Sequence, residues 1–191
     1  MKSVSISGSL RKNVGKKDAK ATRIQGMIPC VLYGGEKQIH FSADEKAFNP
    51  LVYTPEVFTA ELNIDGNKHN AILQALQIHP VTDKIIHLDF LEIFPDKPVK
   101  IDVPVKVAGI SPGVLKGGKL QKKLRTLKIK GLPQHLPDFI EVNIDKLDIG
   151  HMIKISEINV DNIELLNPAN AVVVRVIATR AAAAATSEPA K

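Results

Sequence analysis

Apolar and polar residues alternate with a period of two in many stretches of this chain, and this feature constrains the fold most. Such alternation is typical of half-buried β-strands, whereas an α-helix repeats its apolar face about every 3.6 residues. Six strands are predicted in the first half, at residues 4–10, 27–33, 38–41, 57–64, 68–77 and 85–92. The alternation is clear at 4–10 and 57–64, whereas 27–33 is an apolar run closed by a glycine pair. Only short helical segments interrupt them, and no strand–helix–strand rhythm is visible. The first half is therefore predicted to form a small six-stranded β barrel, closed or nearly closed, with short helices.

Turn residues separate these predicted strands. Asp65-Gly66, between two alternating runs, is a strong hairpin signal because both positions of a tight hairpin turn favour left-handed backbone. Between the first two strands, Asp18 is expected to cap a short helix that runs to Ile24, with Gly26 just past its end.

Pro95-Asp96-Lys97-Pro98 marks the predicted boundary between a first domain, residues 1–94, and a second domain, residues 95–180. Residues 99–107 alternate with period two, and Pro104 within them predicts an edge strand because proline donates no backbone hydrogen bond. Residues 181–191, an alanine tract followed by Thr-Ser-Glu-Pro, are predicted to be a disordered tail. The predicted fold class is mainly β: a six-stranded N-terminal barrel with short helices, plus a second C-terminal β domain.

Positive charge is concentrated near the N-terminus. Up to Ile24, seven Lys and Arg residues accompany one acid, Asp18, and this local charge of +6 equals that of the whole chain. Most of it lies in residues 11–23, the N-terminal basic segment, where Lys16, Lys20 and Arg23 would share one helix face. Because the segment abuts strands, it is suited to neutralising phosphates. The alternative is a solvated charged loop.

A second basic run covers residues 116–130 and contains no acid. Its cations are Lys116, Lys119, Lys122, Lys123, Arg125, Lys128 and Lys130. Acids from Asp138 onward offset this charge, so two interpretations stay open: a solvated hairpin, or a second nucleic-acid contact. Gly117-Gly118 within it matches no phosphate-loop motif.

Several classes of function are not indicated. A single cysteine, Cys30, excludes an internal disulfide and fits a reducing cytosol. No Ser/His/Asp or Cys/His arrangement stands out, so we do not expect an enzyme. His79, His87 and Asp89 could in principle suggest a metal site, but His87 and Asp89 have no third ligand at convincing spacing, so neither a metal nor another cofactor is expected. No apolar run approaches the roughly 20 residues of a membrane span, and no signal peptide is visible, which favours the cytoplasm without membrane attachment.

Polar residues around the last predicted barrel strand are compatible with recognition. His87 and Asp89 lie two apart in a strand and so share a face. With Gln77 and His79 they offer donors and acceptors for base edges or 2′-hydroxyls, although a merely polar outer barrel face would look the same. Tyr33 could stack or hydrogen-bond at this surface, or be a core residue with a wet hydroxyl.

Two motifs, in this order, resemble a known family. The first comprises Arg11-Lys12, Gly15-Lys16 and Arg23-x-x-Gly26-x-Ile28-Pro29-x-Val31-Leu32-Tyr33-Gly34, and the second comprises Gln77-x-His79-Pro80 and His87-x-Asp89-Phe90. They resemble the signatures of the bacterial large-subunit ribosomal protein L twenty-five family. Downstream, Val103-Pro104-Val105, Gly113-Val114, Gly117-Gly118-x-Leu120, Leu132-Pro133 and Leu147-x-Ile149-Gly150 resemble its long form, the general stress protein Ctc type. The resemblance spans about residues 4–178.

The resemblance implies that the barrel binds 5S ribosomal RNA (rRNA) in the large ribosomal subunit, chiefly at a widened minor groove. Carried over residue by residue, the implied RNA-binding residues are Arg11, Lys12, Lys16, Lys20, Arg23, Tyr33, Gln77, His79, His87 and Asp89. For the second domain, 23S rRNA and a neighbouring ribosomal protein are the alternative contacts. The competing hypothesis is a stress-induced RNA-binding chaperone that acts off the ribosome.

This chain departs from the family pattern at two places. Lys20-Ala21 stands where the family often has paired arginines, so one bidentate phosphate contact is expected to be weaker or absent. Ile78 stands where a basic or polar residue is common, which removes another potential RNA contact.

Overall fold

The computed structural model describes residues 2–160 and 162–179. The chain divides into two compact units, which we describe separately. The first, the barrel unit, comprises residues 2–99 together with Leu132–Asp138; the second unit comprises Lys100–Gly131 and residues 139–179. Leu132–Asp138 thus belongs to the barrel unit although it lies within the predicted second domain. The predicted tail lies outside the described residues, and the boundary after residue 94 stays a prediction.

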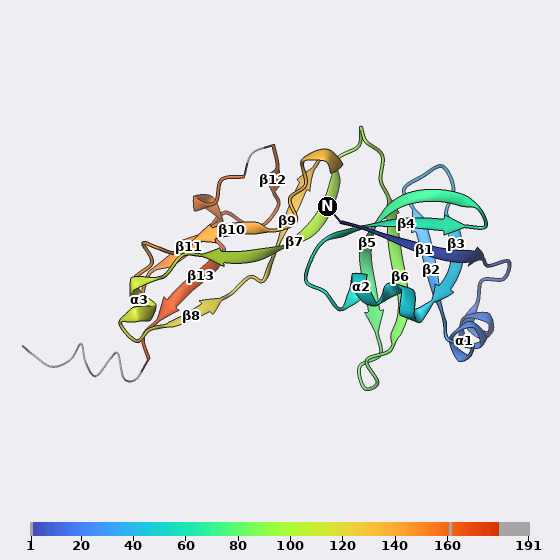
Figure 1. Cartoon of the computed structure of the whole chain (residues 1–191), viewed down its shortest axis with the longest axis horizontal. Helices are drawn as coiled ribbons and strands as arrows, with labels where there is room; N and C mark the ends of the chain where they lie inside the picture. Colours follow the sequence, from blue (N-terminus) through green and yellow to red (C-terminus); the bar gives the residue numbers. More distant parts are fainter. Residues whose placement is uncertain (1, 161, 180–191) are drawn as a thin grey trace, which may run out of the picture. The chain divides into compact units, whose positions relative to one another are not determined.

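The barrel unit is a closed six-stranded β barrel, which confirms the prediction (Figure 1). The strand order is β1-β3-β2-β6-β5-β4, and β4 returns to pair in parallel with β1. The elements are β1 (Lys2–Leu10), α1 (Lys16–Ile24), β2 (Met27–Tyr33), β3 (Ile39–Asp44), the 3-10 helix η1 (Glu45–Phe48), α2 (Asn49–Val52), β4 (Phe58–Ile64), β5 (Asn67–Ile78), β6 (Ile85–Glu92) and the 3-10 helix η2 (Pro133–His135).

Apolar side chains on alternate strand positions fill the barrel. Phe41, Phe48 and Phe90 are completely buried, and the ring centroid of Phe90 lies 6.0 Å from each of the other two. Gly8 of β1 allows this packing, since a Cβ atom there would lie 2.8 Å from the Phe41 ring. The aliphatic residues buried around the rings include Ile6, Leu32, Leu62, Ile64 and Leu88. Because the interior is filled, groups that meet a partner must lie on the outer face.

The turn residues were predicted correctly, whereas the residue at the start of α1 was not. Asp65 and Gly66 have φ of 48° and 92°, which confirms the hairpin between β4 and β5. Gly26, with φ of 77°, follows the end of α1 as predicted. The expected N-cap at Asp18 is wrong: Gly15 precedes the helix, and Asp18 lies in its first turn. There its carboxylate accepts hydrogen bonds from Arg11 instead of capping backbone N–H groups.

The second unit contains two open sheets, ordered β10-β7-β9-β12 and β11-β13-β8. β7 lies between β10 and β9, so the edge strand predicted from Pro104 is wrong. The parallel register with β10 begins only at Val105, so Pro104 removes no bond from that ladder. The elements are β7 (Val99–Ala108), α3 (Pro112–Leu115), β8 (Lys119–Lys122), β9 (Thr126–Gly131), β10 (Ile140–Asn143), β11 (Met152–Lys154), the 3-10 helix η3 (Ile155–Glu157), β12 (Glu164–Leu165) and β13 (Val172–Ile177).

Candidate nucleic-acid interface

The outer face of β5 and β6 carries a strip of polar side chains. Leu88 and Phe90 of β6 are fully buried, so the alternate residues His87 and Asp89 point outward. Gln77 of β5 lies directly opposite His87 in the antiparallel register. Directly opposed residues share a face of the sheet. The structure therefore brings Gln77, His87 and Asp89 together, and we call these three residues the polar strip.

His87 and Asp89 fix each other within this strip. Nδ1 of His87 lies 2.7 Å from Oδ1 of Asp89, and the side chains are 23% and 32% exposed. The contact orients the imidazole, so Nε2 is the ring nitrogen left for an external partner. A histidine held in this way presents one defined polar atom rather than a freely rotating ring.

Tyr33, at the end of β2, lies within electrostatic reach of the strip. It is partly buried, and burial raises the pKa of its phenol, with the negative charge of Asp89 raising that pKa further. The phenol therefore stays protonated near neutral pH and remains a hydrogen-bond donor. Both sequence interpretations of Tyr33, a recognition group and a core residue with a wet hydroxyl, stay open in this environment.

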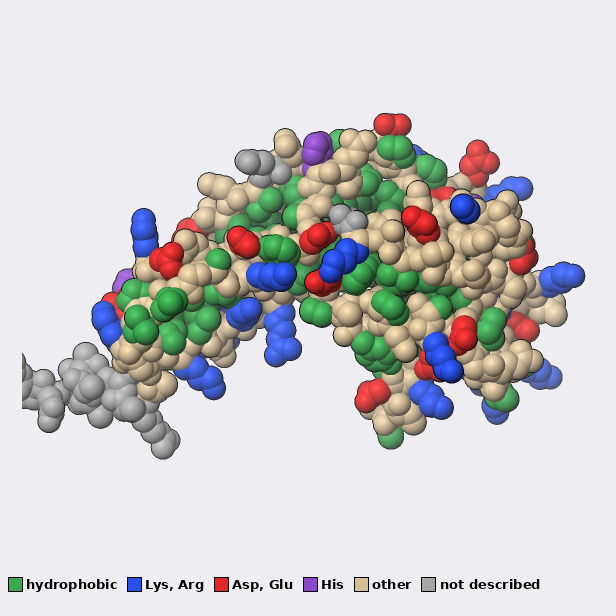
Figure 2. Space-filling view, viewed as in Figure 1, with side chains coloured by type: hydrophobic (Ala, Val, Ile, Leu, Met, Phe, Trp, Pro, Cys, Tyr) green, Lys and Arg blue, Asp and Glu red, His purple; other side chains and the backbone are tan. Residues whose placement is uncertain are grey.

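Helix α1 brings the N-terminal basic segment beside the strip. Nε of Arg23 donates a hydrogen bond to the carbonyl oxygen of Ile86, 3.0 Å away and next to His87 in sequence. Lys16 and Lys20 of the same helix are exposed, as is Lys12, and none has a hydrogen-bond or ionic partner among the described residues. Figure 2 shows Lys and Arg side chains projecting from this side of the barrel unit. Arg23 thus links the helix that carries Lys16 and Lys20 to the strand that carries His87 and Asp89.

Arg11 differs from the other cations of the segment. Its side chain is only 8% exposed, and its guanidinium pairs with Asp18. Nε lies 3.1 Å from Oδ2 of Asp18, and a terminal guanidinium nitrogen donates to the same oxygen. The sequence placed Arg11 with the other candidate RNA contacts, whereas the structure places it inside the segment.

His79 is exposed and also shapes the turn between β5 and β6. Its Nδ1 accepts the backbone N–H groups of Val81 and Thr82 at 3.3 and 3.2 Å. Because Nδ1 is an acceptor here, the ring proton is assigned to Nε2, which faces away from the turn's own hydrogen bonds. His79 thus has a local structural role that its position in the motif did not reveal.

His40 is a candidate that sequence reasoning missed. It lies on β3 opposite Val31 of β2, which is itself opposite Asp89 of β6, so the three positions form one row on the outer face. The sequence feature that could have identified His40 is its polar position in the short alternating strand that follows the Gly34-Gly35 turn. Ile78, one of the two departures from the family pattern, is 41% exposed at the end of β5.

The second basic run is partly neutralised within its own unit. Nζ of Lys116 lies 2.7 Å from Oδ2 of Asp148, and Nζ of Lys130 lies 3.1 Å from Oε2 of Glu164. Lys122 reaches the carbonyl oxygen of Val105 at 3.5 Å. Within the described residues, the cations of the run whose side chains have no hydrogen-bond or ionic partner are Lys119, Lys123, Arg125 and Lys128.

Residues 2–160 and 162–179 carry no metal-ligand cluster and no membrane-spanning helix. No three His, Cys, Asp or Glu side chains are grouped there in a way that could hold a metal ion. In the same residues, no helix has the length and apolar character needed to span a membrane. Cys30 is buried in β2, and this burial raises the pKa of its thiol, so it is a poor nucleophile.

Both halves of the chain match models of protein families. The model described as "Ribosomal L25p family" matches residues 6–90, and that described as "Ribosomal protein TL5, C-terminal domain" matches residues 98–180. A β barrel followed by further β sheets, each matched by such a model, defines the class: this is a ribosomal protein.

Curated relatives named "Large ribosomal subunit protein bL25" match almost the whole chain. A protein of Christiangramia forsetii is 44% identical over 182 residues, which cover 94% of this chain and 83% of that protein. One from Azobacteroides pseudotrichonymphae is 42% identical and covers 98% and 100%, respectively. One from Parabacteroides distasonis is 44% identical and covers 95% and 96%. The chain belongs to the bL25 family of large-subunit ribosomal proteins, as its motifs predicted.

Proposed function

We propose that the barrel unit binds 5S rRNA within the large ribosomal subunit, and that the protein acts in the cytoplasm by fixing RNA conformation, without catalysis. The observation that carries the proposal is the hydrogen bond from Arg23 to the Ile86 carbonyl, which sets the basic helix α1 beside the polar strip. The bL25 names of the relatives support the large subunit as its location. The resemblance of the two motifs supports 5S rRNA as the partner.

The two parts of this surface would perform different tasks. Lys12, Lys16, Lys20 and Arg23 attract phosphates whatever the base sequence, and the counterions they release make binding strongly salt-dependent. The polar strip would give selectivity, because hydrogen bonds require defined donor and acceptor positions. The Gln77 amide can donate and accept, and the Asp89 carboxylate can accept. Nε2 of His87 and the hydroxyl of Tyr33 add further polar atoms. The wide, shallow minor groove of A-form RNA offers 2′-hydroxyls and base edges to such a flat, strand-borne array.

The remaining assignments follow from this placement. We propose that Arg11 and His79 belong to the same interface, with Arg11 behind the exposed lysines and His79 at the turn. For the predicted domain of residues 95–180 we propose a contact elsewhere on the large subunit, with either 23S rRNA or a neighbouring ribosomal protein.

The test compares affinities across salt concentrations. The full chain is titrated with 5S rRNA and with an unrelated structured RNA of similar length, from about 50 to 200 mM salt, the range over which phosphate contacts are strongly screened. We expect 5S rRNA to bind at least about tenfold more tightly near 150 mM salt. Equal affinities with equal salt slopes would refute specific recognition and favour the off-ribosome chaperone.

A further inference from the structure

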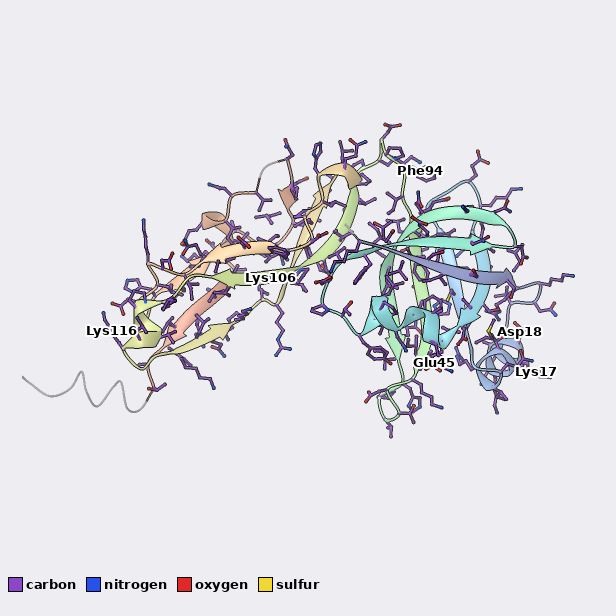
Figure 3. The ribbon with its side chains drawn as sticks, in the orientation of Figure 1. Lys17, Asp18, Glu45, Phe94, Lys106 and Lys116 are labelled. Carbon is purple, nitrogen blue, oxygen red and sulfur yellow. The ribbon has the colours of Figure 1, made fainter. Side chains whose placement is uncertain are left out.

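We propose that Asp18 is a positioning residue for RNA binding, which holds the loop at residues 12–15 in place by clasping the Arg11 guanidinium. We call this pair the Arg11–Asp18 clasp. The inference rests on the proposed function, and it assigns to an acid inside the basic segment a role that increases affinity for a polyanion. Figure 3 labels Asp18 and its neighbour Lys17 on α1.

The clasp connects three parts of the barrel unit. The backbone N–H of Arg11 donates to the carbonyl oxygen of His40 on β3, 2.9 Å away. Its guanidinium donates to Asp18 in the first turn of α1, through Nε and through a terminal nitrogen. The same guanidinium reaches the carbonyl oxygen of Asn13 at 3.5 Å, inside the loop. Arg11 therefore ties the loop to a barrel strand at one end and to the helix at the other.

Burial distinguishes this arrangement from an ordinary surface ion pair. The Arg11 side chain is 8% exposed and that of Asp18 is 38% exposed. An arginine this enclosed cannot meet a phosphate unless the loop opens, and its planar fork is already directed at Asp18. If the carboxylate were removed, a largely buried cation would be left unpaired, which disfavours the closed loop.

The loop carries cations that the proposed interface needs. Lys12 lies within it and Lys16 begins α1 directly after it, and both are exposed. A closed loop fixes the backbone positions of these two lysines before RNA arrives, so less backbone conformational entropy is lost on binding. An open loop would keep the same charge and hold it less firmly.

The two possible roles of Asp18 make opposite predictions. As a negative charge beside a polyanion, Asp18 weakens binding, so Asp18→Ala would tighten it. As the clasp, it strengthens binding, so Asp18→Ala would weaken it. Glu45 is the matched control, because its backbone N–H donates to the Gly26 carbonyl at the far end of α1 and its carboxylate has no partner among the described residues. Figure 3 labels both acids.

The experiment measures the affinity of the full chain for 5S rRNA near 150 mM salt. We expect Asp18→Ala to weaken binding about threefold or more, Glu45→Ala to leave it unchanged or slightly tighter, and Asp18→Glu to restore it to within about twofold. Asp18→Asn, which is almost isosteric, serves if the alanine variant folds poorly. Unchanged or tighter binding by both neutral variants would overturn the proposal.

A second measurement needs no RNA and separates this inference from the proposed function. Trypsin cleavage after Lys12 and Lys16 in the free protein should become about threefold faster or more in Asp18→Ala, with no such change in Glu45→Ala. Unchanged cleavage would overturn the clasp even if 5S rRNA binds. Faster cleavage in a protein that prefers no RNA would keep the clasp and refute specific binding.

Discussion

The N-terminal basic segment and the second basic run are alike in sequence and different in structure. Residues 11–23 hold six cations and residues 116–130 hold seven. In the first, one cation is paired with an acid, Arg23 is anchored to β6, and the other four are exposed. In the second, two cations are paired with acids and a third reaches a backbone carbonyl. The two regions therefore differ less in charge density than in the pairing of their cations and in the fixed polar groups of β5 and β6 to which Arg23 links the first region.

The largest effect is expected when the proposed RNA-binding cations of the first region are replaced, in comparison with the cations of the second region whose side chains have no partner among the described residues. Changing Lys12, Lys16, Lys20 and Arg23 to Gln should weaken binding to 5S rRNA about 100-fold near 150 mM salt and lower the salt slope by about 3. Changing Lys119, Lys123, Arg125 and Lys128 to Gln should weaken it less than about threefold. Filter binding across salt measures both. Equal losses would show that the two regions contact RNA alike.

The next largest effect concerns selectivity. Gln77→Ala should lower the preference for 5S rRNA over an unrelated structured RNA about tenfold, because an amide can read base edges and 2′-hydroxyls. Its affinity for the unrelated RNA should not change. The control is Gln121→Ala on β8, whose amide accepts from Arg175 at 2.8 Å beside the second basic run. If Gln121→Ala reduced the preference for 5S rRNA as much as Gln77→Ala, the selectivity could not be attributed to the polar strip.

Arg23→Ala tests the anchor of α1. We expect about fivefold weaker binding and a salt slope smaller by about 1, with the melting temperature within about 2 °C of wild type, since the side chain is exposed and water can satisfy the Ile86 carbonyl. Calorimetry and titration measure the two quantities. Arg125→Ala, in the second run, should change neither. A collapse of stability in Arg23→Ala would make Arg23 structural.

The smallest expected effect is a loss of stability at high pH that comes from Cys30 and is therefore confined to the barrel unit. Burial raises the pKa of the Cys30 thiol, so the folded barrel keeps the proton where the unfolded chain, with a pKa near 8.5, releases it. The unfolded state then binds fewer protons, and stability falls as pH rises. Between pH 7.5 and 9.0 this contributes about 0.8 kcal/mol to the loss in free energy of unfolding.

Urea unfolding at both pH values measures this loss, and Cys30→Ala is the control that should lack it. Because Cys30 is the single cysteine of the chain, the second unit has no such contribution. A thiol reagent should label the folded protein slowly at pH 8 and the unfolded protein quickly. Rapid labelling of the folded protein would contradict the burial of Cys30.

Features that depend on neighbouring residues were predictable. Alternating and apolar runs located the six barrel strands, and Asp65-Gly66 located a hairpin, because both signals act over a few residues. Two predictions failed because the feature depends on contacts with residues outside the local sequence. Pro104 was expected on an edge strand, but edges depend on which strands pair, and β7 pairs on both sides. Asp18 was expected to cap α1, but its carboxylate bonds to Arg11 in the preceding loop.

By itself, the sequence determined the β class, the positions of the strands, the concentration of charge and, through two ordered motifs, the family. Only the tertiary structure decided what surrounds those charges. Gln77 and His87 oppose each other because the β5–β6 register places them so, and the side chain of Arg23 on α1 reaches the Ile86 carbonyl of β6. Arg11 and Lys12 are neighbours in sequence, yet one is enclosed and the other exposed. The physical reason is that burial and pairing depend on barrel closure, which joins residues far apart along the chain.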